Sequence, residues 1–127
     1  MPPEKDPMNV FQDTLRRIAE RVEGTQAVSL VGTDGIPIDS YGKPDGTSIE
    51  SVAAELGAFI KAAQSPHTDL DSGPIQQLAL VTDRSTVILS RVTREYYLLL
   101  LLSREGNFGR GRFELARAAV TLEKELV

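Results

Sequence analysis

The sequence contains no cysteine and no tryptophan, and its only histidine is His67. Without cysteine the chain offers no disulfide, no thiol nucleophile and no cysteine-ligated zinc site. A lone histidine in a loop rich in proline and aspartate is most often a surface residue. The neighbouring Asp69 and Asp71 lack the further ligands of a calcium-binding loop. We therefore predict no metal site and no cofactor.

The motifs of common nucleotide-binding and hydrolytic enzymes are also absent. No Gly-x-x-x-x-Gly-Lys-Ser/Thr loop, Gly-x-Gly-x-x-Gly turn or Gly-x-Ser-x-Gly elbow occurs. Gly106, Gly109 and Gly111 could direct amides at a phosphate, but a sharp strand-to-helix reversal explains them better. We predict that the chain is not an enzyme.

Long apolar runs are missing too. The five leucines Leu98–Leu102 fall far short of the roughly 20 apolar residues that cross a bilayer. Residues 1–9 contain no basic segment followed by an apolar stretch, which argues against a secretory signal. We expect a cytoplasmic protein.

Charge is distributed unevenly along the 127 residues, whose net charge is -4. Residues 1–80 hold 6 basic and 12 acidic groups, whereas residues 81–127 hold 8 and 6. Seven arginines between Arg84 and Arg117 could meet phosphate or an acidic partner, although a solvated sheet face is the commoner explanation. An acidic chain without tryptophan does not favour nucleic acid as a partner.

The segment Glu95–Ser103 is apolar at nearly every position, which indicates a strand covered on both faces. A buried helical turn would give the same leucine run, but Tyr96 and Tyr97 and the β-branched run Thr86–Thr93 before it favour a strand. We interpret this segment as the centre of a sheet.

The remaining elements follow from periodicity and turn signals. After a flexible tail at residues 1–8, residues 9–127 form a single domain. We predict helices at residues 9–22, 48–64 and 112–126, and strands at residues 26–31, 36–41, 75–82, 86–93 and 95–103.

Local signals set the boundaries of these elements. Asn9 with Gln12, and Thr47 with Glu50, resemble capping pairs at two helix starts. Gly24 is a plausible C-cap. Asp34-Gly35 predicts a tight hairpin, and Pro37 should place the second strand at a sheet edge because it has no amide donor.

The helix at residues 48–64 combines an apolar stripe with many small residues. The stripe comprises Val52, Leu56, Phe59, Ile60 and Ala63. Six small residues permit close approach of another backbone, either the chain's own sheet or a helix of a second copy: Ala53, Ala54, Gly57, Ala58, Ala62 and Ala63.

Three segments carry a family resemblance: Val31–Ile38, Leu78–Leu89 and Arg94–Leu100. They resemble the roadblock family, which includes dynein light chains and bacterial MglB-type regulators. The stretch Gly106–Gly109, leading into residues 113–117, is similar to the extra C-terminal helix of prokaryotic members.

The resemblance implies an α+β fold in the order α-β-β-α-β-β-β-α. A five-stranded antiparallel sheet of order 2-1-5-4-3 would have the outer two helices on one face and the middle helix on the other. Family members pair through their third strands and second helices, so the resemblance implies a homodimer. The residues that would form its interface are Ala53, Gly57, Ala58, Ile75, Gln77, Ala79 and Val81.

The resemblance also implies a partner, a Ras-like small GTPase bound through the paired second helices. The expected contact residues are Glu50, Ala54, Lys61 and Ala62, with Glu55 and Gln64 as further candidates. An arginine finger from Arg104, Arg110 or Arg112 is the alternative. It is disfavoured because these arginines lie in or next to the glycine-rich turn at residues 106–111, which a strand-to-helix reversal already explains. The chain could instead be a non-catalytic scaffold in a larger assembly, or a ligand sensor with an internal cavity.

Overall fold

The computed structural model describes residues 7–44, 46, 48–64 and 74–126, and it gives only the backbone course at residues 7–9, 60 and 62–64. Its elements, in chain order, are α1 (Pro7–Arg21), β1 (Thr25–Gly32), β2 (Pro37–Gly42), α2 (Ile49–Gln64), β3 (Gln77–Val81), β4 (Ser85–Arg91), β5 (Tyr96–Ser103) and α3 (Phe108–Leu126). The predicted element order is confirmed.

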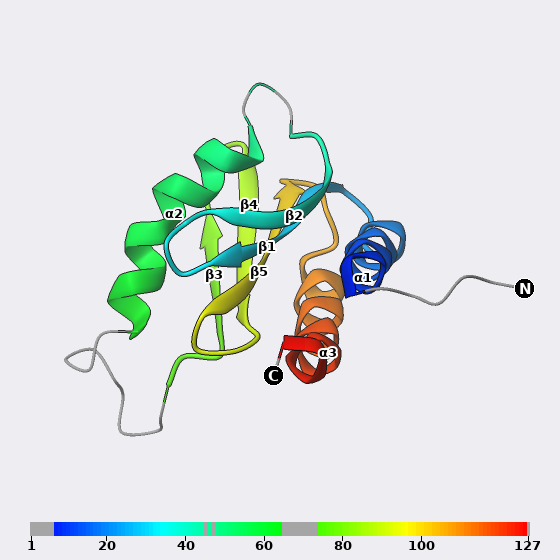
Figure 1. Cartoon of the computed structure of the whole chain (residues 1–127). Helices are drawn as coiled ribbons and strands as arrows, with labels where there is room; N and C mark the ends of the chain where they lie inside the picture. The colour runs from blue at the N-terminus through cyan, green and yellow to red at the C-terminus, as the bar shows by residue number, and fades with distance from the viewer. Residues whose placement is uncertain (1–6, 45, 47, 65–73, 127) are drawn as a thin grey trace, which may run out of the picture.

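The strands form one antiparallel sheet of order β2-β1-β5-β4-β3, as predicted. Helices α1 and α3 cover one face and α2 covers the other (Figure 1). The leucine strand β5 lies in the middle, where alternate leucines enter the two cores: Leu98, Leu100 and Leu102 face α1 and α3, and Leu99 and Leu101 face α2. Burial on both faces explains why its sequence does not alternate.

The β1–β2 hairpin forms around the predicted turn. Gly35 has a φ of 84°, and its backbone amide donates to the carbonyl of Gly32 at 2.9 Å. The Asp34 carboxylate accepts from the amide of Ile36 at 3.0 Å. A side chain at Gly35 would be strained at this positive φ, so the turn requires glycine here.

The predicted start of α1 is wrong, and the start of α2 lies within one residue of its prediction. Helix α1 begins at Pro7, so Asn9 lies inside it, and the Gln12 side chain bonds Asp39 and the carbonyl of Ser40 instead of a cap. Helix α2 is capped by the Ser48 hydroxyl, which accepts from the amide of Ser51 at 3.1 Å. Thr47, the predicted cap residue, lies outside the described residues.

The start of α3 also differs from its prediction, which placed residues 106–111 in a turn and began the helix at residue 112. Helix α3 begins at Phe108, where the Asn107 side chain caps the amide of Arg110 at 3.0 Å. Gly109 and Gly111 are therefore helical. A Cβ at Gly111 would lie 3.0 Å from Leu100 Cδ2 and 3.1 Å from Ile88 Cδ1, so glycine allows α3 to approach the sheet closely.

Candidate interaction surface

The outermost strand β3 presents an open backbone edge. Among the described residues it pairs only with β4, and the amides of Arg91 and Thr82 donate at 2.8 Å to the carbonyls of Gln76 and Ser85. Antiparallel pairs alternate between bonded and non-bonded positions. By this alternation Leu78 and Leu80 bond β4, whereas the backbone groups of three residues point outward: Gln77, Ala79 and Val81. They are three of the four residues of the predicted third strand that were assigned to a dimer interface; the fourth, Ile75, lies just before β3.

Within the described residues, no side chain bonds the outward backbone groups of Gln77, Ala79 and Val81. The Val81 side chain is 65% exposed and that of Ala79 is exposed as well. Such an edge can accept another strand through backbone hydrogen bonds.

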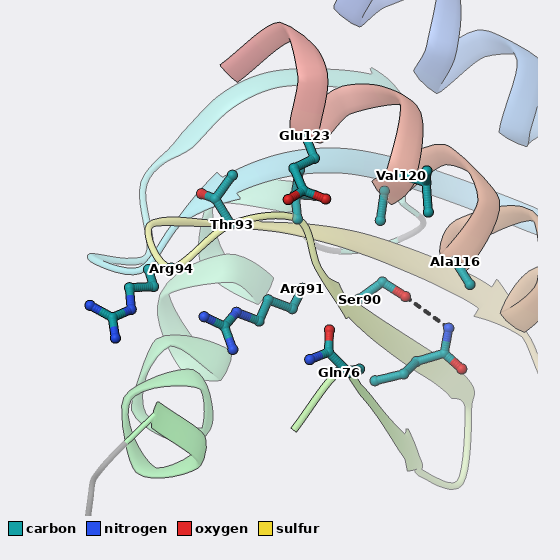
Figure 2. Close-up of a pocket in the computed structure, with 11 residues that line it drawn as sticks. Gln76, Ser90, Arg91, Thr93, Arg94, Ala116, Val120 and Glu123 are labelled. Carbon is teal, nitrogen blue, oxygen red and sulfur yellow. Dashed lines mark hydrogen bonds between the residues drawn. The ribbon is translucent and has the colours of Figure 1, made fainter. Parts of the chain in front are cut away.

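A hollow borders β3 on each face of the sheet. The hollow beside α2 has a volume of about 740 Å³, and its apolar lining includes Val52, Leu56, Leu80, Val87 and Leu101. The hollow beside α3 measures about 620 Å³. Figure 2 shows its two sides, with Ala116, Val120 and Glu123 from α3, and Gln76, Ser90 and Arg91 from the β3–β4 side. Both faces of the sheet are therefore incompletely covered next to the open edge.

Helix α2 turns one stripe toward the sheet. Ala53 is 0% exposed, and a Cβ at Gly57 would lie 3.6 Å from Gly35 Cα. These two predicted interface residues pack within the chain, against the sheet and the β1–β2 turn. Ala58 is exposed on the outer crest of the helix, and Ile75 is half-buried just before β3.

The flank of α2 that the sequence assigned to a GTPase is open to solvent. Glu50, Ala54 and Lys61 are exposed and recur at the spacing of one helical stripe. This stripe borders the β1–β2 turn, because the Gly35 Cβ position lies 3.5 Å from Ala54 Cα. The side chain of Ala62 and that of Gln64 lie outside the described residues, and Glu55 lines the hollow on the β3 side.

Phe59 belongs to the predicted apolar stripe of α2, and it is 53% exposed. It follows Val52 by seven residues and so lies on the flank of α2 that borders the hollow beside β3. Periodicity alone could not predict this exposure. The spacing of Phe59 from Leu56 is the same whether the chain's own sheet or a second protein covers the ring.

The candidate finger arginines are all engaged within the chain. Arg104 bonds the carbonyl of Thr82, Arg112 Nε donates to Gln77 Oε1 at 2.9 Å, and Arg110 pairs with Glu114 at 3.0 Å. These arginines follow β5 or lie on α3, away from the exposed flank of α2.

No helix in the described part of the chain is long and apolar enough to cross a membrane. Among the described residues no group of three or more metal-ligating side chains occurs. The region with His67, Asp69 and Asp71 lies outside that description.

The Roadblock/LC7 domain family model matches residues 11–102, and the chain belongs to that family. No curated protein matches the chain by sequence. The fold is similar to that of MglC from Myxococcus xanthus, with 23% identity and a TM-score of 0.73 over 91% of this chain and 98% of that one.

Two MglB structures are also similar in fold. The gliding protein MglB from Thermus thermophilus has 14% identity and a TM-score of 0.83, over 97% of this chain and 93% of that chain. An MglB described with a tetrameric arrangement has 15% identity and a TM-score of 0.84, over 97% and 92%. At these identities the likeness establishes the fold.

Proposed function

We propose that this protein is a homodimeric regulator of a Ras-like small GTPase, of the MglB type, which activates or binds the GTPase through its α2 helices. The single observation that carries the proposal is the open β3 edge, with unpaired outward backbone groups at Gln77, Ala79 and Val81 among the described residues. Two such edges pair naturally with each other around a twofold axis.

Pairing through β3 would bring two α2 helices side by side. The hollow lined by Leu80 and Val87 lies between α2 and the edge, and Phe59 is exposed on the same flank of α2. Covering these apolar groups on association adds to the backbone bonds. The tetrameric arrangement of an MglB with the same fold supports self-association in this class of proteins.

The opposite flank of α2 then remains available for the GTPase. Glu50 and Lys61 supply charges of both signs on either side of Ala54, a small residue that lets a partner approach closely. Since the candidate arginines are bound within the chain, we infer that regulation acts by positioning the GTPase's own groups and not by donating an arginine finger.

The experiment is to measure GTP hydrolysis by the small GTPase encoded nearest this gene, with and without the protein. Lys61→Glu should reduce binding, whereas Lys124→Glu, the same charge change on the exposed part of α3, should not. Binding without altered turnover would indicate a scaffold. Absence of binding would contradict the proposal.

A further inference from the structure

The seam between α1 and α3 gathers four arginines around one buried carboxylate. Arg17 and Arg21 come from α1, and Arg110 and Arg117 come from α3. Glu114 is only 3% exposed, and its two oxygens lie 3.0 Å from Arg110 Nη2 and 3.6 Å from Arg21 Nη1. These five side chains together carry an excess of three positive charges, in a chain whose net charge is -4.

Glu114 fixes the position of part of this charge. A buried carboxylate is stable only when it is compensated, so Arg21 and Arg110 are drawn to it from opposite sides of the seam. Glu114 Oε1 makes no hydrogen bond of good geometry with any described residue besides its ion pair. The two arginines are thus held in place by charge, and each guanidinium has further N–H groups that can donate to a ligand.

Arg17 and Arg117 add two further positive charges to the seam. Both are exposed, both line a small hollow with Thr14 and Thr121, and neither forms an ion pair with a described residue. The nearest acidic groups along α1 are already engaged, because Arg16 lies 3.1 Å from Asp13 and 3.9 Å from Glu20.

The size of the hollow restricts the ligand. Its volume is about 30 Å³, close to the share of one water molecule in the liquid. A peptide or a ring system cannot enter, but a compact anion can sit at the mouth and accept from guanidinium groups on both helices. Guanidinium groups match the geometry of phosphate oxygens and bond them in pairs.

We propose that the α1–α3 seam binds a phosphate group through Arg17, Arg21 and Arg117. The phosphate belongs either to a soluble compound or to the headgroup of an anionic phospholipid, which present the same chemistry. This site lies on the sheet face opposite α2 (Figure 1) and is independent of the proposed GTPase contact.

The test uses the full chain alone, so its outcome does not depend on any GTPase. Inorganic pyrophosphate is titrated by calorimetry, and vesicles of phosphatidylcholine with phosphatidic acid are tested by co-sedimentation. The variant Arg17→Gln/Arg117→Gln is compared with Arg84→Gln/Arg91→Gln, which removes the same charge near β3 and β4. None of these four arginines forms an ion pair with a described residue, so the melting temperatures should stay close to that of the parent chain.

The parent and the β4-side variant should bind, and the seam variant should bind about tenfold more weakly for each arginine removed. Binding of pyrophosphate alone identifies a soluble phosphate compound, and binding of vesicles alone identifies a headgroup. Failure of the parent chain to bind either probe, or equal losses in both double variants, would overturn the site.

Discussion

The two edges of the sheet are treated in opposite ways. At the β2 edge, Pro37 has no amide donor, the amide of Ser40 donates to Asp39 at 2.9 Å, and the carbonyl of Ser40 accepts from Gln12 at 3.2 Å. At the β3 edge, no such side-chain bonds reach the outward groups of Ala79 among the described residues. In the part of the chain that the structure describes, the β2 edge is closed against strand addition and the β3 edge is open.

The difference between the two edges marks a binding surface more clearly than the distribution of exposed apolar side chains does. An unprotected strand edge is an aggregation hazard, and proteins usually blunt it with proline, charge or a covering element. Within residues 7–44 and 74–126 the β2 edge carries such protection and the β3 edge does not, although both strands are short. We infer that the β3 edge is kept open because it has a partner.

The largest expected effect is in the middle of the sheet, which both edges depend on. Leu99 is 0% exposed and packs in the core beneath α2. Leu99→Ala should lower the free energy of unfolding by about 2 to 5 kcal/mol, because it removes buried methyl groups and leaves a cavity. Urea denaturation measures this. A loss below about 1 kcal/mol would contradict the burial of β5 beneath α2.

Two proline substitutions distinguish the β3 amides that bond β4 from those that point outward. Leu80→Pro removes an amide that bonds β4 and should cost about 2 to 3 kcal/mol of stability. Ala79→Pro removes an outward amide and should cost much less while weakening self-association. Thermal melts and sedimentation of both variants check the pair. If the two prolines destabilise the fold equally, the outward assignment of Ala79 is wrong.

Opening the protected edge should have a smaller effect. Asp39→Ala deprives the Ser40 amide of its acceptor and Gln12 of one partner, at a cost of about 1 kcal/mol. Hydrogen exchange at the Ser40 amide should accelerate. Asp83→Ala, an exposed substitution in the β3–β4 turn, is the matched control and should leave both quantities unchanged. Unaltered exchange at Ser40 in Asp39→Ala would show that the edge is closed by other means.

The smallest effect on stability is expected at Phe59. Phe59→Ser should change the free energy of unfolding by less than about 0.5 kcal/mol, because the ring is 53% exposed. It should nevertheless weaken self-association about tenfold by removing apolar surface next to the open edge. Val120→Ser, at a side chain 60% exposed on α3, serves as the control. Equal effects of the two variants on association would remove α2 from the interface.

The sheet order and the placement of the helices were predicted from the family resemblance, whereas the residues alone gave two positions, a central β5 that is apolar throughout and an edge strand marked by Pro37. The start of α3 could not be predicted, since glycines at 109 and 111 indicate a turn locally and become helical only where α3 approaches Leu100 closely. Long-range packing overrides the local preference of glycine there.

The candidate surface was predictable only in part. Gln77, Ala79 and Val81 are alternate residues of one strand, and the family resemblance assigned them to the interface. The structure shows that they are the β3 residues whose backbone groups point outward. Ala53 looked like a contact residue because it is small, yet its own sheet buries it. Sequence gives the size of a side chain but not which neighbour occupies the space beside it.

The most direct test of the open edge is the mass of the chain in solution, measured by light scattering coupled to size-exclusion chromatography over a range of concentrations. The parent chain should have twice the 13.9 kDa mass of one copy, and Ala79→Pro should shift toward a single copy while keeping a cooperative melt. A parent chain that stays at the mass of one copy at high concentration would contradict the account.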